Sequence, residues 1–206
     1  MNTIAVIDYG MGNLHSVSKA LIKASPSDQI LVTSKRSEIE NSDKIVLPGV
    51  GAIKDCMEAL SRDNLDQVVL RNMAKKPTLA ICVGMQMLLK SSEENHGIKG
   101  FNLIDGKVRR MTSSATVKVP HMGWNQVLQK SEHPMWTDIP DNSFFYFVHS
   151  YACESSLDAI GTTGHGSEFI SAVSKQNIFA VQFHPEKSQN TGLQLYKNFI
   201  NWEGDS

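Results

Sequence analysis

The sequence predicts an α/β fold: an open, mixed but mostly parallel central sheet, flanked by helices, with a smaller β-rich portion. In the first 90 of its 206 residues, short apolar runs alternate with stretches of helical periodicity. Strands this apolar are typical of a parallel sheet that helices cover on both faces. After about Gly97 the pattern changes to short strands and turns. No linker or repeat interrupts the chain, so we expect residues 1–206 to form a single domain.

Turn-forming residues separate the elements expected in the first half of the chain. A glycine-rich turn at 10–13 follows the first strand, and Leu14, Val17, Leu21 and Ile22 then recur at helical spacing. We expect strands at 3–8, 29–33, 44–47 and 77–82, one helix beginning at Leu14, a second at 52–73 with a break at 62–64, and a third at 84–90.

The second half is predicted to be β-rich until a last helix. Short strands and turns are expected between 101 and 129, and an aromatic run, Phe-Phe-Tyr-Phe-Val, marks a strand near 145. The other expected elements are strands at 142–149, 169–174 and 178–183, a turn at 175–177 and a helix at 189–202.

Composition and charge exclude several classes of protein. The chain has 20 Lys plus Arg and 21 Asp plus Glu, a formal net charge of -1, so no basic surplus indicates a nucleic-acid partner. No apolar run is long enough for a bilayer and no basic leader begins the chain, so we expect a cytoplasmic protein with no membrane partner. Its three cysteines are too widely spaced for a zinc site, and His15 replaces the third glycine of a dinucleotide-binding turn. We therefore expect no metal and no cofactor.

The segment 80–84, Ala-Ile-Cys-Val-Gly, is the first candidate for chemistry, because a buried strand is expected to turn into a helix there. It matches a nucleophile elbow, G-x-S-x-G, with Cys82 replacing serine and Ala80 replacing the first glycine. An elbow holds the sulfur at the carboxyl end of the sheet and near a helix N-terminus, whose dipole favours a thiolate. A lone cysteine here is more often a small buried hydrophobe, so Cys82 requires supporting residues.

Support comes from a histidine and a glutamate at the end of a later expected strand. His184 and Glu186 are two apart along extended backbone and project to one side, and Pro185 keeps the preceding residue extended. The carboxylate can orient the imidazole and leave its other nitrogen free to take a thiol proton. Taken alone, the pair would be read as surface residues at a strand end.

A glycine-rich loop supplies the third piece. Leu-Pro-Gly-Val-Gly at 47–51 ends a strand at the same sheet edge, and such a loop can turn backbone N–H groups into a site. Together with the amide of Val83, it would form a two-donor oxyanion hole. Pro-Gly alone would indicate only a turn.

In this order, the three pieces resemble the class I glutamine amidotransferases with a Cys-His-Glu triad, which have a flavodoxin-like fold. Six segments narrow the resemblance, over nearly the whole chain, to the glutaminase subunits of imidazole glycerol phosphate synthase. They are 8–14 (DYGMGNL), 47–52 (LPGVGA), 82–86 (CVGMQ), 120–125 (PHMGWN), 146–151 (YFVHSY) and 183–188 (FHPEKS). Departures are mild: Ala80, Val83 and Ile53 stand where the family usually has Gly, Leu and Phe.

The resemblance implies hydrolysis of glutamine to glutamate and ammonia. Cys82 would attack the side-chain amide carbon to form a thioester, His184 would accept and deliver the proton, and Glu186 would orient His184. The expected oxyanion-hole residues are Val83, Gly51 and Val50. Gln86, one helical turn after Cys82, would contact the polar end of the substrate, as would Glu94 and the backbone of Ser150 and Tyr151. Glu94 is equally well explained as a solvated charge beside Glu93.

The resemblance also implies a partner. Free ammonia would be protonated and lost at neutral pH, and the family passes it to a (β/α)8-barrel cyclase subunit in a heterodimer. The cyclase makes imidazole glycerol phosphate and an aminoimidazole carboxamide ribotide, and glutaminase activity rises with the loaded partner. Residues that resemble that interface are Asn13, Met122, Trp124, Tyr146 and Lys187.

Two other functions stay open on the sequence alone. A paralogous amidotransferase subunit that feeds a surface-polysaccharide sugar pathway would have the same fold and triad. A non-catalytic module on the same scaffold usually loses a triad residue, whereas Cys82, His184 and Glu186 are all present. A generic thiol hydrolase leaves the segment at 120–125 unexplained.

Overall fold

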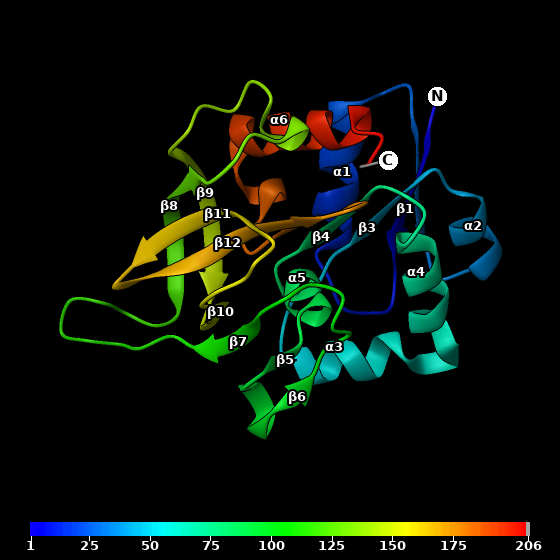
Figure 1. Ribbon diagram of the computed structural model, residues 1–206. Coiled ribbons are helices and arrows are strands. Elements are labelled where there is room, and N and C mark those ends of the chain that lie inside the picture. Colours follow the sequence, from blue (N-terminus) through cyan, green and yellow to red (C-terminus); the bar gives the residue numbers. More distant parts are fainter. Residues whose placement is uncertain (205–206) are drawn as a thin grey trace.

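The computed structural model describes residues 1–204, and its centre is a sheet of five parallel strands with mostly antiparallel strands beyond one edge (Figure 1). Each parallel strand is a run of four or five residues rich in Ile, Val, Leu and Ala, and most of these residues are buried except in the edge strand Gln29–Thr33. In sheet order the five are β2 (Gln29–Thr33), β1 (Thr3–Ile7), β3 (Lys44–Leu47), β4 (Thr78–Ile81) and β13 (Ile178–Val181).

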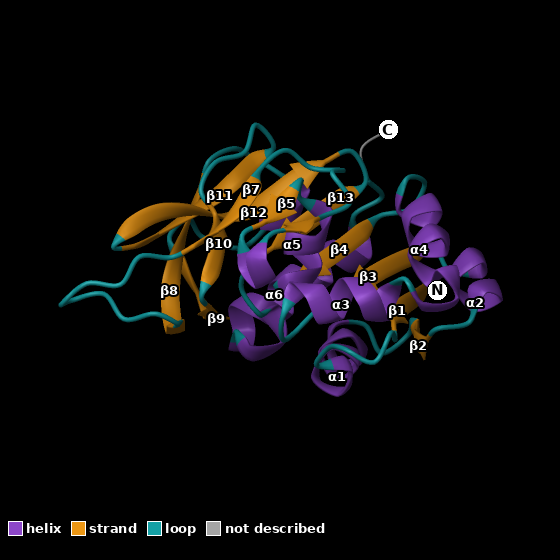
Figure 2. Ribbon diagram, turned by 90° about the horizontal axis from the view of Figure 1, so that it is seen from below, coloured by secondary structure: helices purple, strands orange, loops and turns teal. Residues whose placement is uncertain are grey.

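Helices cover both faces of this parallel part (Figure 1, Figure 2). On one face, α1 (Leu14–Ala24) packs against α6 (Gln189–Asn201), and α1 buries Val17 and Leu21 beneath it. The opposite face carries α3 (Ile53–Leu60), α4 (Leu65–Met73) and α5 (Val83–Leu88). Short α2 (Arg36–Asn41) packs on α4. Ile22 is 51% exposed, which corrects its place on the apolar face of the first helix.

The β-rich portion extends the sheet with antiparallel neighbours, apart from one short parallel pairing between Ser91–Ser92 and Lys107–Arg110. Beyond β13 lie β12 (Ser167–Lys175), β10 (Tyr151–Cys153), β7 (Lys107–Arg110), β5 (Ser91–Ser92) and β6 (Ile98–Lys99). A branch from β12 continues through β11 (Ala159–His165) to the long pair β8 (His121–Gln129) and β9 (Ser143–His149). Short 3-10 turns lie at Arg62–Asn64, Glu94–His96, Pro134–Trp136 and Pro185–Lys187.

The predicted fold class is confirmed, and most predicted elements lie within two residues of their expected bounds. The break expected at 62–64 is a 3-10 turn in which Asp63 has a φ of 53° and separates α3 from α4. The prediction missed α2, β5, β6, β10 and β11. In α2 only Ile39 is buried, and its last carbonyls, those of Ile39 and Glu40, accept 2.8 Å hydrogen bonds from Lys76 Nζ of a distant segment.

Within residues 1–204, no helix has the length and apolar character needed to cross a bilayer. The same described residues hold no cluster of three or more His, Cys, Asp or Glu side chains placed to bind a metal ion.

Candidate active site

A cavity of about 660 Å³ lies where the parallel strands end, as expected for ligand sites in open α/β sheets. Lining residues come from the segments that follow β1, β3, β4 and β13. It brings together most of the residues singled out from the sequence: Asn13, Val50, Gly51, Cys82, Val83, Gln86, Glu94, Ser150, Tyr151, His184 and Lys187. Glu186 lies behind His184, outside the lining.

The predicted elbow is present between β4 and α5. Cys82 has φ 54° and ψ -110°, a conformation that a side chain rarely adopts, and it is only 4% exposed. A Cβ added to Gly84 would stand 2.2 Å from the carbonyl oxygen of Leu47, so only glycine allows α5 to start this close to the loop after β3. The strained backbone therefore aims the sulfur into the cavity.

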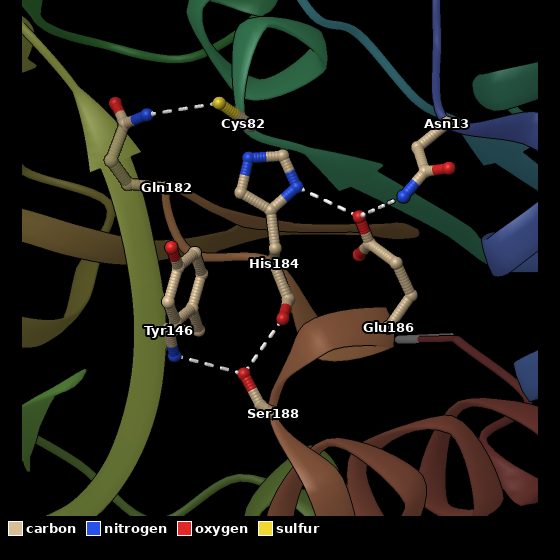
Figure 3. A network of polar contacts seen from close by, with 7 residues as sticks. All are labelled: Asn13, Cys82, Tyr146, Gln182, His184, Glu186 and Ser188. Atoms are coloured by element: carbon tan, nitrogen blue, oxygen red, sulfur yellow. Dashed lines mark hydrogen bonds and ion pairs between the residues drawn. The ribbon is translucent and has the colours of Figure 1, made fainter. Parts of the chain in front are cut away.

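His184 and Glu186 form a buried pair next to Cys82 (Figure 3). His184 Nδ1 is 2.8 Å from Glu186 Oε1, and the two side chains are 2% and 0% exposed. Because the Glu186 carboxylate only accepts, Nδ1 carries the proton and the ring's other nitrogen faces the Cys82 side of the site (Figure 3).

The backbone of His184 is fixed by β9 and by Ser188. Its N–H donates to the carbonyl of Tyr146 at 2.8 Å. Its carbonyl accepts from Ser188 Oγ at 2.7 Å, and the same hydroxyl accepts from the Tyr146 N–H at 3.0 Å (Figure 3). Both backbone polar groups of His184 are therefore hydrogen-bonded, and this fixes the position from which its imidazole extends.

Electrostatics favour a charged pair at this site. Burial alone would lower the pKa of His184, but the negative charges of a Cys82 thiolate and of Glu186 outweigh it and raise that pKa to about 10. The arrangement thus favours an imidazolium at His184, next to the sulfur of the candidate nucleophile.

The glycine-rich loop reaches the site, but one expected donor is already engaged. The Val83 N–H donates to the carbonyl oxygen of Gly49 at 3.3 Å. Val50 and Gly51 line the cavity beside it. In this conformation the Val83 amide is not free for a substrate oxygen, so the predicted two-donor oxyanion hole is not formed.

Comparison with known proteins agrees with this geometry. The family model of class-I glutamine amidotransferases matches residues 5–202. This chain belongs to that family. Two curated relatives are both named imidazole glycerol phosphate synthase subunit HisH: one from Nitrosococcus oceani, 53% identical over 100% of both chains, and one from Methylococcus capsulatus, 50% identical over 98% of each. A solved structure, PurLQS from Thermotoga maritima, shares the fold with a TM-score of 0.69 and 17% identity, covering 98% of this chain and 99% of that one.

The amidotransferase cavity has a group of polar side chains near the elbow. Gln86 is buried, and its Nε2 donates to the Tyr151 carbonyl at 3.1 Å and to Gln182 Oε1 at 2.9 Å. Glu94 Oε2 accepts a 3.0 Å hydrogen bond from the N–H of Ile53, the first residue of α3. Glu94 is half-buried and lines the cavity, so its carboxylate has a structural partner as well as access to the site.

Sequence reasoning missed Gln182, which completes this group. It is fully buried, and its Nε2 lies 3.6 Å from the sulfur of Cys82 (Figure 3). Gln182 stands two residues before His184 at the end of β13, so an alternating strand pattern places both side chains on the same side. That spacing was the available signal.

A second group that the sequence did not single out is a pair of buried histidines on β8 and β9. His149 Nδ1 is 2.9 Å from the Tyr151 carbonyl, which can only accept, so Nδ1 carries the proton and Nε2 accepts from His121 Nδ1 at 3.0 Å. Burial is the main cause that lowers the pKa of His121 to about 3 and that of His149 to about 4. Both rings are neutral and their tautomers are fixed by the carbonyl of Tyr151.

Three of the five expected interface residues, Met122, Trp124 and Tyr146, lie on the outer side of the β8–β9 hairpin, whereas Asn13 and Lys187 line the cavity. We call this outer side the hairpin face: Met122, Trp124, Phe144 and Tyr146. Trp124 and Tyr146 are paired across the strands and meet edge to face, with ring centroids 6.1 Å apart. Lys187 Nζ lies 5.7 Å from the Tyr146 ring centroid.

Proposed function

We propose that this amidotransferase is the glutaminase subunit of an imidazole glycerol phosphate synthase. It hydrolyses glutamine through a Cys82 thioester and hands the ammonia to a (β/α)8-barrel cyclase subunit. The observation that carries the chemistry is the buried His184–Glu186 pair beside an elbow cysteine at the end of the cavity. Residues 1–206 act as a single domain, and the protein works in the cytoplasm.

In the first half of the reaction, the Cys82 thiolate attacks the side-chain amide carbon of glutamine. The carbonyl oxygen becomes an oxyanion, and the imidazolium of His184 gives its proton to the departing nitrogen, which leaves as ammonia. The C–N bond breaks and a glutamyl thioester remains on Cys82. Glu186 stabilises the charge of His184 throughout.

In the second half, His184 is neutral and accepts a proton from water. The hydroxide attacks the thioester carbon, the C–S bond breaks and glutamate leaves with the thiolate restored. No other acid or base is required, because one imidazole gives and regains a single proton in the cycle.

The oxyanion needs a rearrangement of the Gly49–Val50 peptide. Its carbonyl now accepts from the Val83 N–H, and in a trans peptide the Val50 N–H points the opposite way. Rotating this one peptide frees the Val83 amide and turns the Val50 N–H toward the substrate. Each such donor stabilises the transition state by about 3 kcal/mol, so the loop controls the rate.

The other cavity residues hold the substrate. The carboxylate of Glu94 suits the ammonium group of glutamine, and the backbone of Ser150 and Tyr151 suits its carboxylate. Gln86 and the histidine pair keep the Tyr151 carbonyl in place from behind.

The hairpin face is proposed to dock the cyclase subunit. Met122 and Phe144 are 62% and 52% exposed, and Trp124 is 44% exposed, which is unusual for large apolar side chains that lie together. The face adjoins the cavity, because Val148 lines the cavity and pairs with Met122 across the hairpin. A partner bound here would cover the exit that ammonia takes. Lys187 and Asn13 stand at the same opening.

The names of the curated relatives favour this assignment over a surface-polysaccharide pathway. Both relatives, at 53% and 50% identity over essentially the full chain, are subunits of imidazole glycerol phosphate synthase.

The test is glutamate release by the purified chain, alone and with a histidine-pathway cyclase subunit and its nucleotide substrate. Cys82→Ala is the control. Stimulation that disappears in the variant supports triad and partnership together. Glutamine hydrolysis that ignores this cyclase would contradict the partnership alone. No hydrolysis under either condition would contradict the glutaminase assignment.

A further inference from the structure

Two side chains from outside the cavity donate hydrogen bonds to backbone carbonyls of the glycine-rich loop. The hydroxyl of Tyr9, at the end of β1, donates to the carbonyl of Pro48 at 2.6 Å. The thiol of Cys56, on α3, donates to the carbonyl of Val50 at 3.3 Å. Tyr9 is 7% exposed and Cys56 is 0% exposed, and neither lines the cavity.

These two hydrogen bonds fall on alternate peptide groups. Tyr9 holds the peptide that follows Pro48, and Cys56 holds the peptide that follows Val50. Within residues 1–204, the peptide between them, Gly49–Val50, has a single hydrogen bond, the long 3.3 Å contact from the Val83 N–H. It is the peptide that has to rotate to form the oxyanion hole.

Crowding prevents the loop from moving as a whole. A Cβ on Gly49 would lie 2.6 Å from the backbone N of Gly84, so the loop already touches the start of α5. Burial raises the pKa of Cys56 to about 11 and the pKa of Tyr9 still further above its usual value, so both groups keep the protons that they donate. Both hydrogen bonds to the loop therefore persist at neutral pH.

We propose that Tyr9 and Cys56 are positioning residues for the oxyanion hole, which fix the carbonyls on either side and confine the rotation to the Gly49–Val50 peptide. This rests on the proposed function. With either bond removed, a neighbouring peptide also turns, and fewer molecules present both Val83 and Val50 N–H groups in register. Glutamine binding is left unchanged, because the residues that hold its ends belong to other segments.

The variants are Tyr9→Phe and Cys56→Ala, with Cys56→Ser as a rescue because a serine hydroxyl can also donate. Cys153→Ala is the matched control: Cys153 is likewise fully buried and donates to a carbonyl, that of Ser155, at 3.2 Å, away from the loop. Glutaminase kcat and KM are measured on the full chain with the cyclase subunit and its nucleotide substrate.

We expect kcat to fall about fivefold in Tyr9→Phe and Cys56→Ala at unchanged KM, the effect of one neutral hydrogen bond. Cys56→Ser retains more than half of the kcat, and Cys153→Ala stays within about twofold of the parent. As a readout independent of activity, the amide NMR signals of Val50 and Val83 shift in the two loop variants and stay in place in Cys153→Ala.

The outcomes separate the two proposals. A parent chain that hydrolyses no glutamine overturns the glutaminase and, with it, the role of the two residues. A parent that is active with unchanged kcat in both variants overturns the positioning role alone. An equal fall in Cys153→Ala overturns it as well, since that result indicates general destabilisation. A rise in KM that accounts for the loss also overturns it, since that result places the effect in glutamine binding.

Discussion

Asn13 Nδ2 lies 3.4 Å from Oε1 of Glu186, the same oxygen that accepts the 2.8 Å hydrogen bond from His184 (Figure 3). The second oxygen of Glu186 is buried without a hydrogen-bond partner in the described chain. The carboxylate is therefore oriented through one oxygen, from the turn before α1 on one side and from the imidazole on the other. Asn13 therefore helps to orient Glu186, a role that is separate from the interface role expected from the sequence.

The first prediction follows from this contact. Asn13→Ala should lower glutaminase kcat by about two- to fivefold at constant KM, since a long hydrogen bond to a charged group is lost. Glu186→Gln should lower kcat by a factor of about 10² to 10⁴, because it removes one of the two negative charges, those of Cys82 and Glu186, that raise the pKa of His184. Steady-state rates of both variants, with exposed His15→Ala as control, show whether the loss of kcat is smaller in Asn13→Ala than in Glu186→Gln. A rise in KM in Asn13→Ala with kcat unchanged would show that Asn13 acts on the substrate and not through Glu186.

A second prediction concerns the elbow. Gly84→Ala should destabilise the protein and abolish activity, because the new Cβ would stand 2.2 Å from the Leu47 carbonyl and push α5 from the loop. Gly164→Ala is the matched control, since nothing lies within 4 Å of its added Cβ. Urea unfolding and glutaminase assays on both variants test this. A stable, active Gly84→Ala protein would mean that the loop and the helix separate easily.

The sequence predicted the parallel core well because each strand there is a short apolar run bounded by turn residues, a local signal. Elements held by distant partners were missed. The hydrogen bonds from Lys76 that cap α2 come from a segment 36 and 37 residues away, and β10 is three residues long and paired on both sides. No pattern within either stretch carries that information.

The site was predicted where chemistry dictates residue type and spacing. Cys82, His184 and the glycine-rich loop converge because parallel strands end at one edge. The hydrogen bond of the Val83 amide to the loop could not be predicted from the sequence, because residue identity does not determine the orientation of a single peptide group. The hydrogen bond from Cys56 to the loop was missed for a related reason: its acceptor is a backbone carbonyl, which every residue has.

A third prediction tests the hairpin face. Trp124→Ala should weaken cyclase binding by about 10- to 100-fold, because a large aromatic at the centre of an apolar patch is a typical hot spot. Leu157→Ala is the control, since Leu157 is 93% exposed and lies away from the patch. Calorimetric titration with the cyclase subunit measures both. Glutaminase activity of the isolated chain should be the same in the two variants, and an equal affinity for the cyclase would rule out this face as the docking site.

The last prediction is a pH dependence of stability. The pKa values of His121 and His149 are lowered to about 3 and about 4, so between there and pH 6.5 the unfolded chain binds two protons that the folded chain does not. Their contribution is fully present above pH 6.5 and is lost as the pH falls, with a limiting slope of about 1.4 kcal/mol per pH unit for each histidine. The contribution of His184 to stability has the opposite pH dependence, because its pKa is raised to about 10 and its contribution is lost as the pH rises through that value.

Urea unfolding at pH 5 and pH 7 measures this pH dependence. The difference in unfolding free energy between the two pH values should be smaller in His121→Gln than in the parent, whereas exposed His15→Gln should keep the parent's difference. The same difference in His121→Gln as in the parent would mean that the buried ring takes up its proton without unfolding.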